Sequence, residues 1–151
     1  VFVGYRGYEK KKVEPRFCFG HGLSYAEFSF GALKLSSPEL SADEPLVVSI
    51  TVENIGNRSG SEVVQVYVAD CEASVARPEK ELVAFAKLVL EPGQSGEVSF
   101  TIRHRDVSFW DPHEGGWLAE AGAFEVRVGR SSADIHAVAS FALAQDIRSE
   151  G

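Results

Sequence analysis

The stretch that decides the fold class is Leu46-Val47-Val48-Ser49-Ile50-Thr51-Val52-Glu53, in which an apolar residue occupies every second position. Alternation with a period of two is typical of a β-strand that has one face in a core and the other face in solvent. The same period recurs at residues 64–68, 98–102, 124–128 and 135–143, and no stretch has a convincing amphipathic helical pattern. The sequence therefore predicts an all-β domain.

Turn-forming residues separate these strands at regular intervals, as they do at residues 54–60 and 91–95. About seven main strands between residues 27 and 145 predict an immunoglobulin-like or fibronectin type III-like β-sandwich. Even spacing alone leaves a small barrel open as an alternative. We expect one cooperative core, with these residues near its centre: Ile50, Val66, Phe100, Val126 and Phe141.

Details of the strands are also predicted. The apolar positions change parity around Gly31-Ala32, which indicates a β-bulge within the first strand. Gln65 and Tyr67 alternate with inward-facing valines and are expected to point outward. The turn at residues 91–95 predicts a hairpin between the strands at 82–90 and 98–102. The polar residues 146–151 are expected to form a frayed tail.

Residues 1–26 differ from the rest of the chain, because aromatic residues alternate with glycines there and Pro15 interrupts them. This composition predicts an extended N-terminal arm with little regular structure. Its aromatic side chains need another surface against which to be buried. The chain has no methionine and begins at Val1 inside an apolar run, which indicates a fragment of a longer protein.

Charge and residue spacing exclude several function classes. A net charge of −7 and a pI near 5.1 argue against nucleic acid or an anionic membrane as the partner. The spacing of Cys18 and Cys71 fits no metal motif, and it leaves open either a disulfide or two separate thiols. The histidines are scattered, and neither a nucleophile elbow nor a carboxylate pair is evident. The residues therefore predict no catalytic group, no metal and no cofactor.

Three residues carry weaker signals. Asn57 begins an Asn-Arg-Ser acceptor for N-glycosylation in a predicted turn, although a plain loop explains the tripeptide equally well. Trp110 and Trp117 flank the longest late loop, and exposed rings there could stack on sugars. Packing between strands is the alternative fate of both tryptophans. No paired aromatic platform is evident on one strand face.

Four segments, in order, resemble the C-terminal end of glycoside hydrolase family 3, which comprises β-glucosidases and β-xylosidases, and the likeness is greatest to fungal members. The segments are Val3-Gly4-Tyr5-Arg6 with Tyr8; Phe17-Cys18-Phe19-Gly20-His21-Gly22-Leu23-Ser24-Tyr25 with Phe28; Arg77-Pro78-Glu79-Lys80-Glu81-Leu82 with Phe85 and Leu90-Glu91-Pro92-Gly93; and Gly122 with Phe124, Val128-Gly129 and Ser131-Ser132-Ala133-Asp134-Ile135. The match covers residues 1–143. Cys18 departs from the family, which commonly has proline there, so the arm lacks a restraint on φ.

The resemblance implies that residues 27–145 are the family's fibronectin type III-like domain and that residues 1–26 are the linker from its α/β domain. It implies no catalytic residue, because the family's nucleophilic Asp and acid/base Glu lie in other domains. The chain alone is then not an enzyme, although its parent is a glycoside hydrolase. The residues that match the domain junction are Tyr5, Arg6, Phe17, Phe19 and Tyr25.

Two hypotheses follow. The first is an accessory domain that stabilises the catalytic barrel and the α/β domain of the parent chain, without catalysis of its own. The second is a carbohydrate-binding sandwich that adsorbs glucan through Trp110 and Trp117. The family includes secreted and intracellular members, so the location stays open, with an extracellular parent slightly favoured over a cytoplasmic one.

Overall fold

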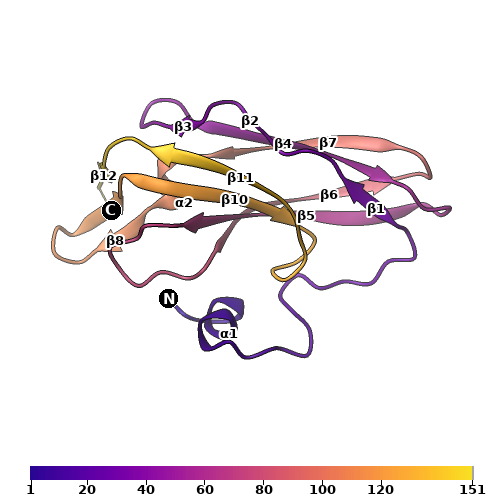
Figure 1. The fold of residues 1–151 in the computed structure, drawn as a ribbon, viewed down its shortest axis with the longest axis horizontal. Helices are drawn as coiled ribbons and strands as arrows, with labels where there is room; N and C mark the ends of the chain where they lie inside the picture. Colours follow the sequence, from indigo (N-terminus) through magenta and orange to yellow (C-terminus); the bar gives the residue numbers. More distant parts are fainter. Residues whose placement is uncertain (151) are drawn as a thin grey trace.

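Two facing sheets make up the sandwich in the computed structural model, which describes residues 1–150 (Figure 1). The first sheet has strand order β1-β4-β2, and β7 pairs with the other edge of β4. The second sheet has order β3-β11-β10-β5-β6, in which only β3 and β11 run parallel. The all-β prediction is confirmed. The strands are β1 (Phe28–Phe30), β2 (Lys34–Leu35), β3 (Glu39–Leu40), β4 (Leu46–Asn54), β5 (Gly60–Asp70), β6 (Glu81–Leu90), β7 (Ser95–Ile102), β10 (Gly122–Gly129) and β11 (Ile135–Leu143).

The core lies between the two sheets and follows from the alternation in sequence. Along β4 every second side chain is buried, and the inward side chains of β5 and β10 meet them from the opposite sheet. Phe124 and Phe141 stack there with ring centroids 5.4 Å apart. Burying one such apolar side chain contributes about 1.5–3 kcal/mol. All the residues expected near the centre are buried: Ile50, Val66, Phe100, Val126 and Phe141.

The first strand is interrupted where the parity changes. β1 and β2 both pair with β4, and residues 31–33 between them leave the ladder. The Gly31 N–H donates to the Thr51 carbonyl at 2.9 Å, so this residue passes close to β4. The bulge expected at Gly31-Ala32 is thus a break that divides one strand into two.

The predicted hairpin between residues 82–90 and 98–102 is wrong. β6 pairs with β5 whereas β7 pairs with β4, so the turn at residues 91–95 crosses from one sheet to the other. The buried side chain of Asn54 holds this crossing, since its Nδ2 donates to the Leu90 carbonyl at 2.9 Å and to the Arg58 carbonyl at 2.8 Å. The Pro-Gly turn signal is local and does not specify whether the strands beside it pair.

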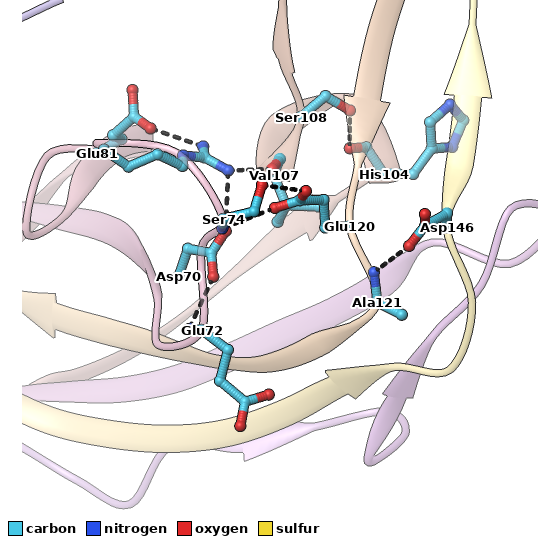
Figure 2. Close-up of polar contacts among 11 residues, drawn as sticks. Asp70, Glu72, Ser74, Glu81, His104, Val107, Ser108, Glu120, Ala121 and Asp146 are labelled. Carbon is cyan, nitrogen blue, oxygen red and sulfur yellow. Dashed lines mark hydrogen bonds and ion pairs between the residues drawn. The ribbon is translucent and has the colours of Figure 1, made fainter. Parts of the chain in front are cut away.

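A third, smaller sheet closes one end of the sandwich and corrects the prediction of a frayed tail. Its order is β12-β9-β8, formed by Ile147–Ser149, Gly116–Ala119 and Phe109–Asp111. Ile147 is only 9% exposed and belongs to the core cluster. Asp146 accepts a hydrogen bond from the Ala121 N–H at 2.8 Å, as Figure 2 shows. One apolar residue in a polar stretch is too short a pattern to predict a strand.

Two short helices were also not expected. α1 (Tyr5–Lys11) occupies the arm, and α2 (His104–Val107) precedes β8. Gly7 discourages a helical interpretation of the arm, yet a Cβ there would lie 2.8 Å from the Phe2 carbonyl oxygen, so the close packing of the first turn requires glycine. The arm is therefore partly helical rather than extended throughout. Within residues 1–150, neither helix is long and apolar enough to cross a membrane.

The burial of Ile147 leads to a stability prediction. Ile147→Ala should lower the free energy of unfolding by about 2–4 kcal/mol, because a cavity replaces a core side chain. Ile55 is 58% exposed, so Ile55→Ala, the same chemical change, should cost less than about 0.5 kcal/mol. Urea denaturation followed by circular dichroism measures both. Equal effects of the two substitutions would show that β12 does not contribute to the core.

Candidate interdomain site

The arm covers the outer face of the second sheet, and this changes the fate of two outward-facing residues. Gln65 and Tyr67 do point away from the core, as expected, but they are 4% and 0% exposed. The Tyr67 hydroxyl donates to Gln65 Oε1 at 2.6 Å. Gln65 Nε2 in turn donates to the Arg130 carbonyl at 2.6 Å and to the Gly20 carbonyl of the arm at 3.4 Å. These residues form a buried polar floor under the arm.

Aromatic rings of the arm close over that floor. The Tyr5 ring stacks on Phe19 with centroids 4.9 Å apart and meets the edge of Tyr67 at 5.9 Å. Backbone groups then fix the contact, because the Leu82 N–H donates to the Tyr5 hydroxyl at 2.7 Å and the Ser132 N–H donates to the Phe19 carbonyl at 2.9 Å. The arm therefore binds through both rings and backbone, and not through apolar area alone.

Two ion pairs join α1 to the start of β6. Lys80 Nζ lies 2.5 Å from Glu9 Oε1, and their side chains are 6% and 18% exposed. Arg6 Nη2 lies 3.2 Å from Glu81 Oε1 at a more open position. The second carboxylate oxygen of Glu9 is buried and has no hydrogen-bond partner within residues 1–150. Removing Lys80 would therefore leave a desolvated carboxylate without its counter-charge.

Arg77 extends this network to α2. Its guanidinium, 10% exposed, donates to Glu81 Oε2 at 2.7 Å, to Asp70 Oδ2 at 3.3 Å and to the Val107 carbonyl at 2.6 Å. In Figure 2, dashed lines join Asp70, Glu81 and Val107 to the Arg77 guanidinium. Glu81 thus receives Arg77 on one oxygen and Arg6 on the other, which couples the arm to the end of the sandwich.

The structure divides the five residues expected at the domain junction into two groups. Tyr5 and Arg6 face the sandwich and are partly buried against it. Phe19 contributes to the same contact but stays 47% exposed. Phe17 and Tyr25 lie on the outside of the arm and are 64% and 89% exposed. The inner group attaches the arm to the sandwich, and the outer group is left facing solvent.

The sequence did not nominate several residues of this site: Gln65, Tyr67, Arg77, Lys80 and Glu81. The last three lie in the Arg-Pro-Glu-Lys-Glu-Leu segment, which supported the family resemblance without suggesting a role for its charges. A large aromatic residue at an outward strand position, such as Tyr67, is the one local sign that the outer face is covered.

Burial raises the pKa of Tyr67 far above its ordinary value, and the neighbouring Tyr5, Glu9 and Cys18 raise it further. All three neighbours belong to the arm, so the upward shift of the Tyr67 pKa depends in part on the arm being bound. Cys18 also compensates in part for the missing proline, because its thiol donates to Ser131 Oγ at 3.2 Å. Cys18 and Cys71 are separate free thiols.

The two tryptophans lie side by side next to the ion network of Arg6, Arg77 and Glu81. Trp110 and Trp117 are directly paired across β8 and β9, with ring centroids 5.6 Å apart and planes at 74°. Trp110 is 46% exposed, whereas Arg105 covers the Trp117 ring at 3.5 Å from its centroid. The two residues share a face of the small sheet, but their rings are nearly perpendicular and one is covered, so they do not form a flat paired platform. Asn57 lies exposed in a bend after β4.

Comparison with known proteins agrees with this architecture. A family model described as "Fibronectin type III-like domain" matches residues 62–132. A beta-glucosidase of Rhizobium radiobacter is 47% identical over 146 residues, which are 97% of this chain and 18% of that protein. Probable beta-glucosidase H of Emericella nidulans is 42% identical over 146 residues, which are 96% of this chain and 18% of that protein. The structure of beta-glucosidase 3B from Thermotoga neapolitana in complex with alpha-D-glucose superposes with a TM-score of 0.91 at 39% identity. The match covers 99% of this chain and 20% of that one.

The fold and the family model together define a fibronectin type III-like β-sandwich. The chain belongs to the C-terminal fibronectin type III-like domains of glycoside hydrolase family 3 β-glucosidases, and it spans about a fifth of the length of the curated relatives it matches. Bacterial and fungal relatives are similar to it at comparable identity, 47% and 42%, so the likeness is not special to fungal members.

The Glu9–Lys80 pair leads to a prediction about arm attachment. Lys80→Ala should loosen the arm, because it leaves Glu9 buried without its counter-charge. Trypsin should then cleave at Lys10, Lys11 and Lys12 about tenfold faster or more, which corresponds to about 1.4 kcal/mol of easier local opening. Lys87 is exposed on β6 and serves as the matched control, Lys87→Ala. Identical cleavage rates in the two variants would contradict the role of this pair.

The raised pKa of Tyr67 predicts a loss of stability at high pH. The unfolded chain releases the phenolic proton near pH 10, whereas the folded chain retains it, so stability from this group is complete below about pH 10 and falls above it. Between pH 10 and 11.5 the free energy of unfolding should fall with a slope that approaches about 1.4 kcal/mol per pH unit.

Tyr67→Phe should remove this part of the pH dependence, and denaturant unfolding at several pH values measures the difference from the original chain. Tyr25 is 89% exposed, so Tyr25→Phe is the control that should leave the pH dependence unchanged. Parallel pH curves for the original chain and Tyr67→Phe would contradict the prediction.

Proposed function

We propose that this chain is an accessory domain that stabilises the catalytic domains of a β-glucosidase-type glycoside hydrolase and does not catalyse hydrolysis itself. Residues 1–26 form the linker from the preceding α/β domain, and residues 27–145 form the accessory sandwich. The partners are the catalytic barrel and the α/β domain of the same parent chain. The likeness to β-glucosidases about five times longer than this chain supports this assignment.

The observation that carries the proposal is the two-sided arm. Its inner side is attached to the sandwich by Tyr5, Arg6 and Glu9, so the arm has a defined path over the second sheet. Its outer side presents apolar side chains without cover, among them Phe17 and Tyr25. Exposed apolar side chains that gather on one ordered segment, as Val13, Phe17, Leu23 and Tyr25 do in the arm, are typical of an interaction surface. A neighbouring domain of the parent chain is the partner that the family supplies.

The first test is catalytic. The pure 151-residue chain should hydrolyse no nitrophenyl β-glucoside above the heat-denatured background, whereas the full-length parent should. Heat-labile turnover by the chain alone would contradict the accessory role.

The second test concerns the outer side of the arm. Tyr25→Ser should leave the melting temperature of the isolated chain unchanged, because the side chain is 89% exposed there. The same change should lower the melting temperature of the full-length enzyme by about 1–2 °C, since burying one aromatic side chain contributes about 1.5–3 kcal/mol and the unfolding entropy grows with chain length.

Phe85 is 69% exposed on β6 outside the arm, and Phe85→Ser is the matched control that should be neutral in both proteins. Differential scanning calorimetry measures the six melting temperatures, those of the original sequence and the two variants in each protein. A Tyr25→Ser effect as small in the full-length enzyme as in the isolated chain would show that this surface contacts no other domain.

A further inference from the structure

A hollow of about 470 Å³ opens beside the tryptophan pair, at the end of the sandwich formed by β8 and β9. Its apolar lining is formed by Val75, Phe109, Trp110, Pro112 and Trp117. Small-molecule sites are typically concave, mainly apolar, about 300–1,000 Å³ in volume and provided with a few polar groups. The hollow meets each of these conditions.

The two tryptophans have different parts in this hollow. Trp110 is 46% exposed, so its ring is open to a ligand. Trp117 is less exposed and carries the Arg105 guanidinium over its ring, 3.5 Å from the centroid. Its edge-to-face contact with Trp110 holds that ring in place. Trp110 is thus the contact surface, and Trp117 positions it.

The charged groups that line the hollow are paired within the domain. Arg6 and Arg77 share Glu81, and Asp111 lies 3.5 Å from Arg148. The lining side chains therefore offer little net charge to an anion or a cation, and the one further charge is the α-amino group of Val1, which also lines the hollow. Asp111 Oδ1 accepts the His113 N–H at 3.0 Å, and this bond is the main cause that lowers the pKa of Asp111. The carboxylate is ionised at neutral pH and accepts hydrogen bonds at the rim.

An open indole face, a nearly neutral hollow and an acceptor at its rim suit one class of ligand, a neutral molecule with both hydroxyl groups and flat apolar faces. Pyranose rings with equatorial hydroxyls have this character, since their axial C–H bonds cover the two faces. We infer that the hollow beside Trp110 binds a short, neutral oligosaccharide of gluco-configured units. This inference does not depend on the proposed accessory role.

The test uses the fluorescence of the chain, whose two tryptophans, the only ones in the sequence, both line the hollow. Titration with cellotriose should give a saturable change in emission, whereas sorbitol, a polyol without a ring, should give none. Trp117→Phe leaves Trp110 as the sole tryptophan; because it alters the ring that positions Trp110, the response should stay saturable but with a weaker affinity.

Binding should also be measured by calorimetry, because Trp110→Ala removes the reporting ring. This variant should weaken the affinity for cellotriose at least tenfold, and Phe85→Ala, which alters an exposed aromatic residue elsewhere, should not change it. Unfolding curves verify that each variant is folded. A cellotriose response that does not saturate, or one that Trp110→Ala leaves intact, would overturn the inference.

Discussion

The position of the arm depends on a cluster of ion pairs at the start of β6. A guanidinium that is nine-tenths buried is tolerated only when acceptors surround it, and Arg77 finds them on β5, on β6 and at the end of α2. The same turn presents Lys80 and Glu81 to the arm. One short segment therefore fixes the ends of two strands and also the path of the helix that lies over the second sheet.

The arm also explains why side chains on the outer face of β5 are buried. Its inner side chains belong to the core, yet Gln65 and Tyr67 on its other face are as buried as the core valines. A sheet face with a buried phenol and amide is stable only under a cover that supplies hydrogen bonds, and the arm supplies the Gly20 carbonyl and the Tyr5 ring. The sandwich and the arm thus share buried contacts, even though their sequences look unrelated.

The sequence predicted the sandwich because its signal is repetitive: alternation in β4, β5, β7, β10 and β11 agrees along the whole chain. It did not predict features set by single contacts between distant segments. β12 depends on Ile147 reaching the core, and the crossing after β6 depends on Asn54, 36 residues away from Leu90. At the candidate site, the resemblance gave Tyr5 and Arg6, but the partners Lys80 and Glu81 became visible only when α1 was placed against β6.

The division of the arm into an inner and an outer side has a thermodynamic consequence for assembly. A disordered linker would lose its conformational freedom when it bound a neighbouring domain, at about 1–2 kcal/mol per backbone residue ordered. Here the contacts of Tyr5, Glu9 and Phe19 with the sandwich already fix much of the arm. The outer residues Phe17 and Tyr25 then contribute burial without that entropic loss. A preorganised surface of this kind is how the accessory role that we propose would stabilise the neighbouring domains.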